Sequence, residues 1–165
     1  MLKRFYPEHE KDSAYKLDYE GLYVKGYRGI IFDVDNTLVP HGAPADKQAL
    51  RLFKRLQRIG FDTVLLSNNK EPRVKSFAGQ VGSKYIYKAG KPSPEGYLKA
   101  MEQMNTTKEN TIFVGDQLFT DILGAKNLGI VTYLVRPIHP KEEVQILLKR
   151  KLEKIVLYFY HRQKK

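Results

Sequence analysis

The sequence predicts an α/β fold in which a parallel sheet of five strands lies between two layers of helices, a three-layer Rossmann-like arrangement. Short apolar runs alternate along the chain with segments of helical spacing, which is typical of a parallel sheet covered on both faces. Several of these runs end in small polar or acidic residues, as strands do at the ligand-binding edge of such a sheet. The expected strands are residues 29–32, 62–66, 84–87, 111–114 and 130–135.

Five helices are expected between and after these strands, placed by apolar spacing or by a proline or glycine at one end. They are residues 45–59, 71–80, a segment that begins at 94, 121–128 and 140–160. Gly60 and Gly129 follow the first and fourth of them, where glycine ends a helix. Ser93 is expected as the N-cap of the third, with Pro94 at its first position. Residues 1–28 show no clear periodicity, so we expect short helices and loops there.

The chain of 165 residues has the length of one domain, which we divide into an N-terminal extension (1–28), a core (29–135) and a basic C-terminal helix (140–165). A hydrophobic content of 42% excludes a disordered chain. The absence of cysteine excludes disulfides, thiol catalysis and cysteine-based zinc sites. No apolar run is long enough for a signal peptide or a spanning helix. We therefore expect a cytoplasmic protein, or one attached peripherally to the inner face of the membrane.

The charge of the chain is strongly positive, because 29 Lys and Arg stand against 18 Asp and Glu, a net charge of +11. Such an excess favours an anionic partner, which could be nucleic acid, an anionic membrane or a phosphorylated substrate. A basic surface without a specialised partner is the alternative, and charge alone does not decide between them.

Acidic residues follow two of the predicted strands and form a candidate site. Asp33 and Asp35 stand two positions apart, and such close carboxylates need a cation between them. Mg²⁺, which prefers oxygen ligands, is the natural candidate, and Asp116 and Asp121 add carboxylates from a second strand end. A carboxylate can also act as a nucleophile, with its neighbour as general acid and base. The alternative is that these residues form turns and cap helices.

Four short motifs resemble those of the haloacid dehalogenase (HAD) superfamily of phosphohydrolases, and they occur in the family's order. They are Asp33-Val34-Asp35-Asn36-Thr37 (DxDxT), Leu65-Leu66-Ser67-Asn68-Asn69 (a strand that ends in Ser or Thr), Gly90-Lys91-Pro92, and Gly115-Asp116 with Thr120-Asp121 (GDxxxTD). One such motif is a modest signal, whereas four in order are specific. The chain also resembles the small capless members of subfamily IIIA, the YqeG-type proteins and phosphatidylglycerophosphate phosphatases.

The resemblance implies a role for each acidic residue. Asp33 would attack phosphorus and form an aspartyl-phosphate. Asp35 would protonate the leaving oxygen and then activate water, which implies a phosphate ester as substrate because relatives that cleave carbon–halogen bonds generally lack this acid. Asp33, Asp35 through its backbone carbonyl, and Asp116 would hold Mg²⁺.

The resemblance also implies which residues bind phosphate. Ser67 and Lys91 would hold the oxygens of the transferring phosphoryl group, since phosphoryl transfer depends on positioning and on charge. Asp121 would fix Lys91 or a metal-bound water. Asn68 would be a secondary phosphate or loop contact, although a plain helix cap explains it equally well. Taken by itself, Lys91 could be an ordinary surface lysine.

The spacing of the motifs leaves no room for a separate cap domain. The segments between Thr37 and Ser67 and between Ser67 and Lys91 hold one or two elements each, fewer than a folded cap of about 50 residues needs. We therefore expect an open site, closed only by small loops such as 40–44, in which His41 is either a substrate contact or a residue without a role. An open site suits a large substrate or completion by a partner subunit.

The C-terminal segment is basic and amphipathic. Residues 141–165 carry eight Lys or Arg and three Glu, a net charge of +5. Apolar residues recur there at helical spacing, namely Val144, Leu147, Leu148, Leu152, Ile155, Val156 and Phe159. A helix of this kind can lie at an anionic membrane surface. It can equally pack its apolar stripe on the sheet and leave its charges in water, and both can hold together.

Three functions fit these observations. The first is a Mg²⁺-dependent phosphomonoester hydrolase, with a lipid head group such as phosphatidylglycerophosphate as the leading substrate. The second is an RNA- or ribosome-associated binding protein on a HAD scaffold; the charge favours it, but the sequence has no aromatic RNA-binding motif. The third is a phosphatase of small metabolites, nucleotides or sugar phosphates, whose site is completed by oligomerisation. The oligomeric state stays open.

Overall fold

The structure is a computed structural model that describes residues 1–139 and 144–164, with side chains described at all of these except 144–146. It contains one parallel sheet of six strands in the order β1-β6-β5-β2-β3-β4. The strands are β1 (His9–Lys11), β2 (Gly29–Phe32), β3 (Asp62–Leu66), β4 (Lys84–Ile86), β5 (Thr111–Gly115) and β6 (Val131–Val135). The predicted α/β fold is thereby confirmed, while the predicted number of five strands is wrong by one.

The additional strand, β1, lies in the N-terminal segment for which only helices and loops were expected. It has three residues, His-Glu-Lys, and no apolar run, so nothing in its sequence distinguishes it from a loop. Its partner defines it, because β1 pairs in parallel with the buried strand β6, and His9 lies opposite Tyr133. The Glu8 carboxylate fixes this register by accepting a hydrogen bond of 3.0 Å from the backbone N–H of Thr132.

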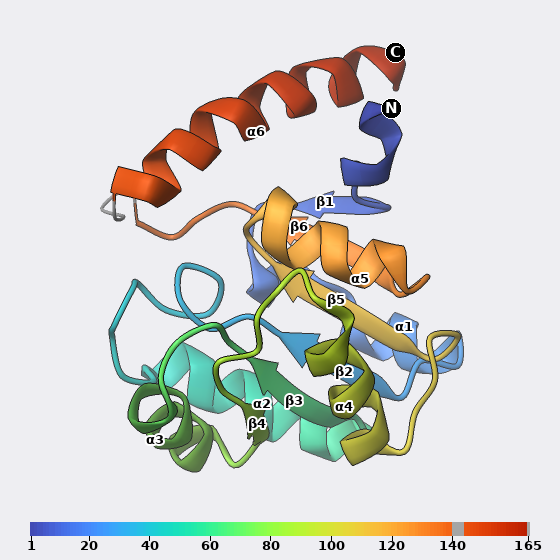
Figure 1. Ribbon diagram of the computed structural model, residues 1–165. Coiled ribbons are helices and arrows are strands. Elements are labelled where there is room, and N and C mark those ends of the chain that lie inside the picture. The colour runs from blue at the N-terminus through green and yellow to red at the C-terminus, as the bar shows by residue number, and fades with distance from the viewer. Residues whose placement is uncertain (140–143, 165) are drawn as a thin grey trace.

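Helices cover both faces of the sheet (Figure 1). They are α1 (Tyr19–Val24), α2 (Lys47–Ile59), α3 (Glu71–Val81), α4 (Pro94–Met104), α5 (Leu123–Asn127) and α6 (Val144–Gln163). Short 3₁₀ turns, η1 (Leu2–Phe5) and η2 (Ala14–Lys16), precede α1, and a π-helical turn, η3 (Leu118–Ile122), leads into α5. The predicted start of the last helix at residue 140 lies outside the described residues.

Alternation along the strands divides the core between the two faces, since successive strand side chains point to opposite sides. Ile30 and Phe32 of β2 pack in one cluster with Phe53 of α2 and Phe77 of α3. Ile31 packs in the other cluster with residues of α4 and α5. Because both faces of β2 are buried, its sequence is apolar throughout, as is typical of a central parallel strand.

The segment predicted as one helix over 121–128 is a π-helical turn followed by a short α-helix. The carboxylate of Asp121 accepts hydrogen bonds of 3.2 Å from the backbone N–H groups of Asp116 and Gln117. This acidic side chain therefore binds the backbone that precedes the helix, and the first turn is widened where it does so. π-Helical turns of this kind are frequent at functional sites.

The last helix, α6, lies at the top of Figure 1. It packs on η1, η3 and β6 through a third cluster of buried residues. Its buried side chains Val156 and Tyr160 meet Tyr6, Leu118 and Leu134. Among the residues that the structure describes, no helix has both the length and the apolar composition needed to cross a membrane.

Candidate active site

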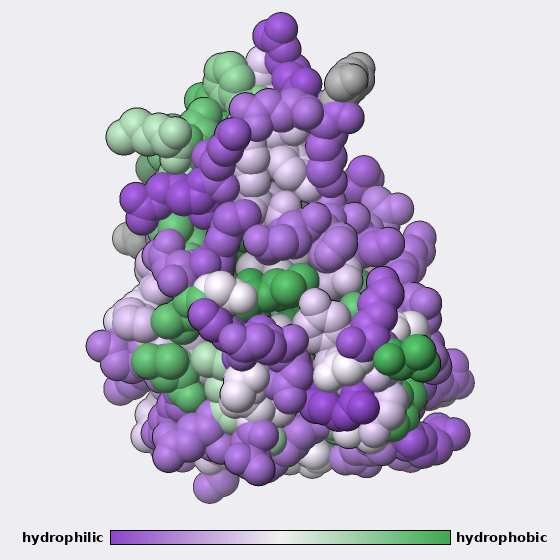
Figure 2. Space-filling model, turned by 90° about the vertical axis from the view of Figure 1, so that its right-hand side faces the viewer, coloured by the Kyte–Doolittle hydropathy of each residue, from purple (hydrophilic) through white to green (hydrophobic). Residues whose placement is uncertain are grey.

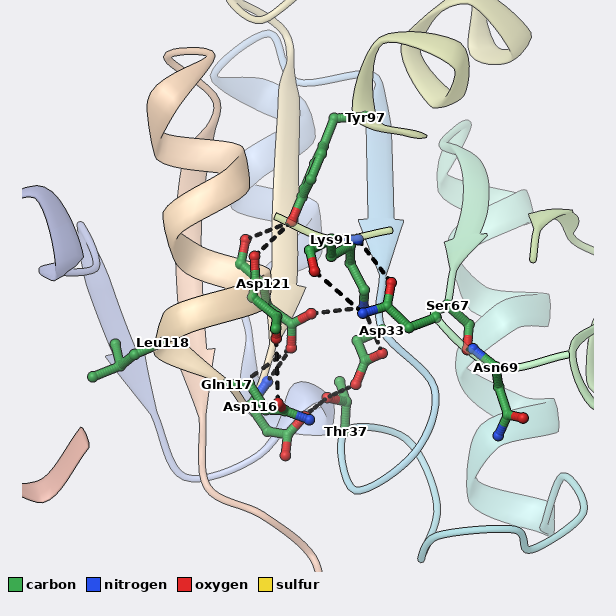
Figure 3. Close-up of polar contacts among 12 residues, drawn as sticks. Asp33, Thr37, Ser67, Asn69, Lys91, Tyr97, Asp116, Gln117, Leu118 and Asp121 are labelled. Carbon is green, nitrogen blue, oxygen red and sulfur yellow. Dashed lines mark hydrogen bonds and ion pairs between the residues drawn. The ribbon is translucent and has the colours of Figure 1, made fainter. Parts of the chain in front are cut away.

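The carboxyl ends of the central strands bring three of the predicted site residues together. Phe32 at the end of β2 lies opposite Leu65 of β3 and Val114 of β5. Asp33, Ser67 and Asp116 follow within two residues of these paired positions. All three are buried and lie at one edge of the sheet, where parallel α/β sheets bind ligands. Figure 3 shows them with Lys91 and Asp121.

A tight turn follows β2 and fixes Asp33. Asn36 has a φ of 62°, in the left-handed region that Asn tolerates better than most residues. Its backbone N–H donates to the carbonyl of Val39 over 2.7 Å. The turn places the Thr37 hydroxyl 2.9 Å from an Asp116 oxygen and 3.2 Å from an Asp33 oxygen. Thr37 thus links the acidic residues of two strands.

Lys91 is buried between two carboxylates. Its Nζ lies 2.8 Å from Asp33 Oδ1 and 2.7 Å from Asp121 Oδ1, as the dashed lines in Figure 3 show. Burial by itself would lower the pKa of Lys91, but the charges of Asp121 and Asp33 outweigh it and raise that pKa above its ordinary value. The amine therefore stays protonated and supplies a fixed positive charge.

The Lys91 loop is fastened to the loop after β3. The side-chain amide of Asn68 accepts a hydrogen bond from the Lys91 backbone N–H over 2.8 Å and donates to the Lys91 carbonyl over 3.3 Å. The Ser67 hydroxyl accepts from the Asn69 backbone N–H over 3.1 Å. The structure thus gives Asn68 a contact between loops, of the kind expected as one alternative, and places both Ser67 and Asn68 on the wall of the cleft described below.

Three carboxylates gather beside Lys91. One oxygen from each of Asp33, Asp116 and Asp121 lies within 4.8 Å of the others, and all three residues are buried. Burial and the neighbouring negative charges raise the pKa of Asp116 well above its ordinary value and raise that of Asp121 to about 6. A cluster of buried oxygen donors whose charges repel one another fits a hard divalent cation.

The sequence suggests Asp33, Asp35 and Asp116 as the metal-binding residues, whereas the cluster contains Asp121 and not the side chain of Asp35. Asp33 and Asp116 are brought together as expected, and Asp121 joins them. The carboxylate of Asp35 lies outside the cluster, so any contribution of Asp35 to a metal site would come from its backbone carbonyl, the part that the resemblance implies.

The Asp35 side chain is held chiefly by residues outside the four motifs, while Asn69 of the second motif donates to its Oδ2 over 3.4 Å. Its Oδ1 accepts hydrogen bonds from the Gly42 backbone N–H over 2.8 Å and from the Arg73 guanidinium over 2.9 Å. Burial would raise the pKa of Asp35, but the Gly42 hydrogen bond and the Arg73 charge together lower it below the ordinary value. Arg73, at the start of α3, is thus a part of the site that the sequence did not reveal.

Two further residues of the site lie outside the motifs. Arg150 of α6 forms an ion pair with the Asp116 carboxylate and also donates to the Asp116 carbonyl. The Tyr97 hydroxyl of α4 lies 2.9 and 3.0 Å from the backbone carbonyls of Thr120 and Asp121. No sequence signal marks either residue, because an arginine in a basic helix and a tyrosine at a buried helical position both have ordinary explanations.

A cleft of about 310 Å³ opens above these groups. Residues of all four motifs line it, together with His41 from the loop after the first motif; the lining residues are Asp33, Asp35, Asn36, His41, Ser67, Asn68, Asn69, Lys91, Gln117 and Thr120. Its wall carries hydroxyl, amide, ammonium and carboxylate groups, which suits a polar, anionic ligand rather than an apolar one.

The sequence model of the haloacid dehalogenase-like hydrolases matches residues 42–129, more than half of the chain. The chain belongs to this family. The resemblance to the HAD family is thereby confirmed, and the matched range contains Ser67, Lys91 and Asp116.

Two curated relatives cover most of this HAD-like chain. It is 35% identical over 159 residues to the probable phosphatase YqeG of Bacillus subtilis, across 95% of this chain and 92% of that protein. It is 31% identical over 159 residues to the chloroplastic/mitochondrial phosphatidylglycerophosphate phosphatase 1 of Arabidopsis thaliana. That match covers 89% of this chain and 45% of the plant protein, so the chain spans less than half of this relative.

Solved structures with the same fold include two that cover about two thirds or more of the chain. One is the cobalt-bound deoxy-D-mannose-octulosonate 8-phosphate phosphatase of Haemophilus influenzae, with a TM-score of 0.55, 17% identity, and coverage of 68% of this chain and 69% of that chain. The other is a hypothetical protein of Xanthomonas campestris, with a TM-score of 0.56, 18% identity, and coverage of 77% and 71%. At these identities the likeness shows the fold alone.

Proposed function

We propose that this HAD-like hydrolase is a divalent-cation-dependent phosphatase that cleaves phosphomonoesters through an aspartyl-phosphate on Asp33. The observation that carries the proposal is the buried ammonium of Lys91, held within 2.8 Å of both Asp33 and Asp121 beside a third carboxylate. A buried cation among carboxylates at the floor of an open polar cleft supports the handling of a phosphoryl group, whose oxygens carry negative charge throughout the transfer.

In the first half of the reaction, an Asp33 oxygen attacks phosphorus and the ester oxygen leaves on the opposite side. Lys91 and the Ser67 hydroxyl, which line the same cleft, would hold the phosphoryl oxygens. Asp35 has a low pKa in the free protein, so it must take up a proton before this step. The leaving alkoxide takes that proton, and the Arg73 guanidinium at 2.9 Å stabilises the carboxylate that results.

In the second half, the ionised Asp35 takes a proton from water, and the resulting hydroxide attacks phosphorus. The bond to Asp33 breaks, inorganic phosphate leaves, and Asp35 is again protonated, so each group returns to its starting state. Asp33, Asp116 and the backbone carbonyl of Asp35 would hold Mg²⁺, with Asp121 beside them. The ion, when bound, neutralises charge on the phosphoryl oxygens and on the carboxylates.

We propose a lipid head group, phosphatidylglycerophosphate or a closely related phosphomonoester, as the leading substrate. The name of the Arabidopsis relative supports this choice. So does the short segment between Asp35 and Ser67, which holds a loop, α2 and β3 but no cap domain over the cleft. An uncapped site admits a phosphate that stays attached to a large assembly.

Phosphate release with Mg²⁺ tests the proposal. The panel contains phosphatidylglycerophosphate in mixed micelles, nucleotides, sugar phosphates and 4-nitrophenyl phosphate. We expect turnover of the lipid, and a loss of about a thousand-fold or more in Asp33→Asn, which removes the nucleophile but keeps its shape. Asp62→Asn is the matched control, because Asp62 is exposed at the start of β3, far from the cleft, and pairs with Lys84.

The panel also separates the remaining functions. Preferential turnover of nucleotides or sugar phosphates would replace the lipid with a small metabolite and leave the mechanism intact. Folded, Mg²⁺-loaded protein that cleaves none of these substrates, yet binds RNA equally well with and without Asp33→Asn, would overturn the enzyme proposal in favour of a binding protein.

A further inference from the structure

The C-terminal helix α6 has two apolar faces, of which the domain uses one. The buried face consists of Val156 and Tyr160, together with Glu153, whose carboxylate accepts a hydrogen bond of 2.9 Å from the Leu118 backbone N–H. Since this face already attaches the helix to the domain, packing accounts for these residues and leaves the other face of α6 without an explanation.

The other face is exposed and apolar. Leu148, Leu152, Ile155 and Phe159 follow one another at steps of four, three and four residues, which aligns them along one side of a helix. Their exposed fractions lie between 42% and 59%. Single exposed apolar residues are ordinary on a protein surface, whereas a continuous line of four indicates an interaction site.

A second exposed line runs beside the first and carries positive charge. Leu147, Lys151, Lys154, Tyr158 and Arg162 follow at steps of four, three, four and four. Glu153, the one acidic residue between 144 and 163, is buried and paired with Arg150. The exposed face of α6 therefore presents cations and no carboxylate. In Figure 2, hydrophobic surface gathers at the upper left beside strongly hydrophilic surface, at the height at which Figure 1 places α6 and the N-terminal segment.

We infer that this face of α6 docks on an anionic lipid bilayer and lies in its interfacial plane. A bilayer satisfies both lines at once, because acyl chains take up leucine, isoleucine and phenylalanine side chains while anionic head groups bind lysines at the same depth. A second copy of the chain would set two positive faces against each other and repel. RNA would use the cations and the aromatic rings and leave the aliphatic residues exposed.

The contacts between α6 and the rest of the domain determine how the active-site cleft would be oriented relative to a bound bilayer. Arg150, one residue before Lys151, bonds both the carboxylate and the carbonyl of Asp116, and Glu153 bonds the backbone of η3. The helix is therefore fixed to the loop that follows β5, and a bilayer bound to α6 would lie at a set orientation to the cleft. The inference stands on these contacts and does not require the proposed substrate.

Vesicle co-sedimentation of the full chain tests the inference without any phosphomonoester present. We expect binding to vesicles of phosphatidylcholine mixed with phosphatidylglycerol, and little binding to phosphatidylcholine alone, at about 0.1 M salt. Lys151→Gln with Lys154→Gln should weaken binding about 30-fold, since each lysine near such a surface contributes roughly fivefold. Leu152→Ser with Ile155→Ser should weaken it at least tenfold.

The matched control is Leu98→Ser with Lys99→Gln on α4, two exposed residues of the same types on another part of the surface. This variant should bind the mixed vesicles like the unaltered protein, and all variants should keep the far-ultraviolet circular dichroism of the fold. Equal loss in the control, equal binding by all variants, or no binding to the mixed vesicles would overturn the inference. So would a dimer in solution that the Leu152 and Ile155 changes dissociate, because a second copy would then cover this face.

Discussion

Arg150 of the last helix forms an ion pair with Asp116 at the end of a central strand, and so joins the C-terminal element to the carboxylate cluster. The arginine side chain is 13% exposed and the aspartate side chain is fully buried. Arg150 and Lys91 thus place two cations among the three buried carboxylates of Asp33, Asp116 and Asp121. The cluster is thus largely neutralised by the protein's own side chains.

Replacing Arg150 should make stability depend more strongly on Mg²⁺. In Arg150→Met the Asp116 carboxylate stays buried without its partner, so the free energy of unfolding in the absence of metal should fall by about 3–5 kcal/mol. Mg²⁺ should restore more stability to this variant than it adds to the unaltered protein. Urea unfolding with and without Mg²⁺ measures both quantities. Lys149→Met, an exposed change on the same helix, is the control, and equal gains from Mg²⁺ in all three proteins would contradict this role of Arg150.

Arg73 should set the pH dependence of catalysis through Asp35. The guanidinium holds the pKa of Asp35 low, so Arg73→Gln should raise it. Because Asp35 must be protonated to act as the acid in the first step, the limb of kcat/KM that falls at higher pH should move to higher pH. Arg73→Lys, which keeps the charge, should move it less. If kcat/KM falls by the same factor at every pH and the limb does not move, Arg73 does not act on Asp35.

Stability without metal should fall as the pH rises through the region in which Asp121 titrates. Its pKa in the folded protein is about 6, above the ordinary value of 3.8. The folded protein therefore keeps a proton that the unfolded chain releases, and stability declines between about pH 4 and 6. Mg²⁺ competes with that proton, so its stabilising effect should be small near pH 5 and larger above pH 7. Thermal unfolding across pH measures this, with sodium chloride of equal ionic strength as the control; a Mg²⁺ effect independent of pH would count against the carboxylate site.

Tyr97 should stabilise the loop that carries Asp121. Tyr97→Phe removes a hydroxyl from two buried carbonyls, which should lower the free energy of unfolding by about 1–3 kcal/mol. We also expect kcat to fall more than KM changes, because Asp121 positions Lys91. Tyr87→Phe, at an exposed tyrosine, is the control. Unchanged stability and kcat in Tyr97→Phe would show that these hydrogen bonds do not hold the loop.

The central part of the fold could be predicted because its signals are local. The buried strands β2, β3 and β5 are apolar runs that end in polar residues, and Gly60 and Gly129 adopt positive φ where the helices were expected to end. β1 could not be predicted, because a three-residue edge strand without apolar residues gains its conformation from β6 alone.

The residues of the site likewise divide into those with a local sequence signal and those whose position depends on packing. The order of the four short motifs along the chain predicts that their residues lie at one site, namely Asp33, Ser67, Lys91 and Asp116. Arg73, Tyr97 and Arg150 reach the site from the surfaces of helices, and their contribution depends on how those helices pack. The two faces of α6 show this well, since one apolar pattern in the sequence contains both a buried line and an exposed one.

The pairing of β2 with β5 has a consequence for the chain during its synthesis. Thr37 and Asp116, which share a hydrogen bond, are 79 residues apart, and Arg150 follows another 34 residues later. A nascent chain therefore carries Asp33 long before it carries Asp116 and Asp121, the carboxylates that lie beside it in the fold. The carboxylate cluster can assemble only after β5 and η3 have been synthesised, and its ion pair with Arg150 only after α6 has followed.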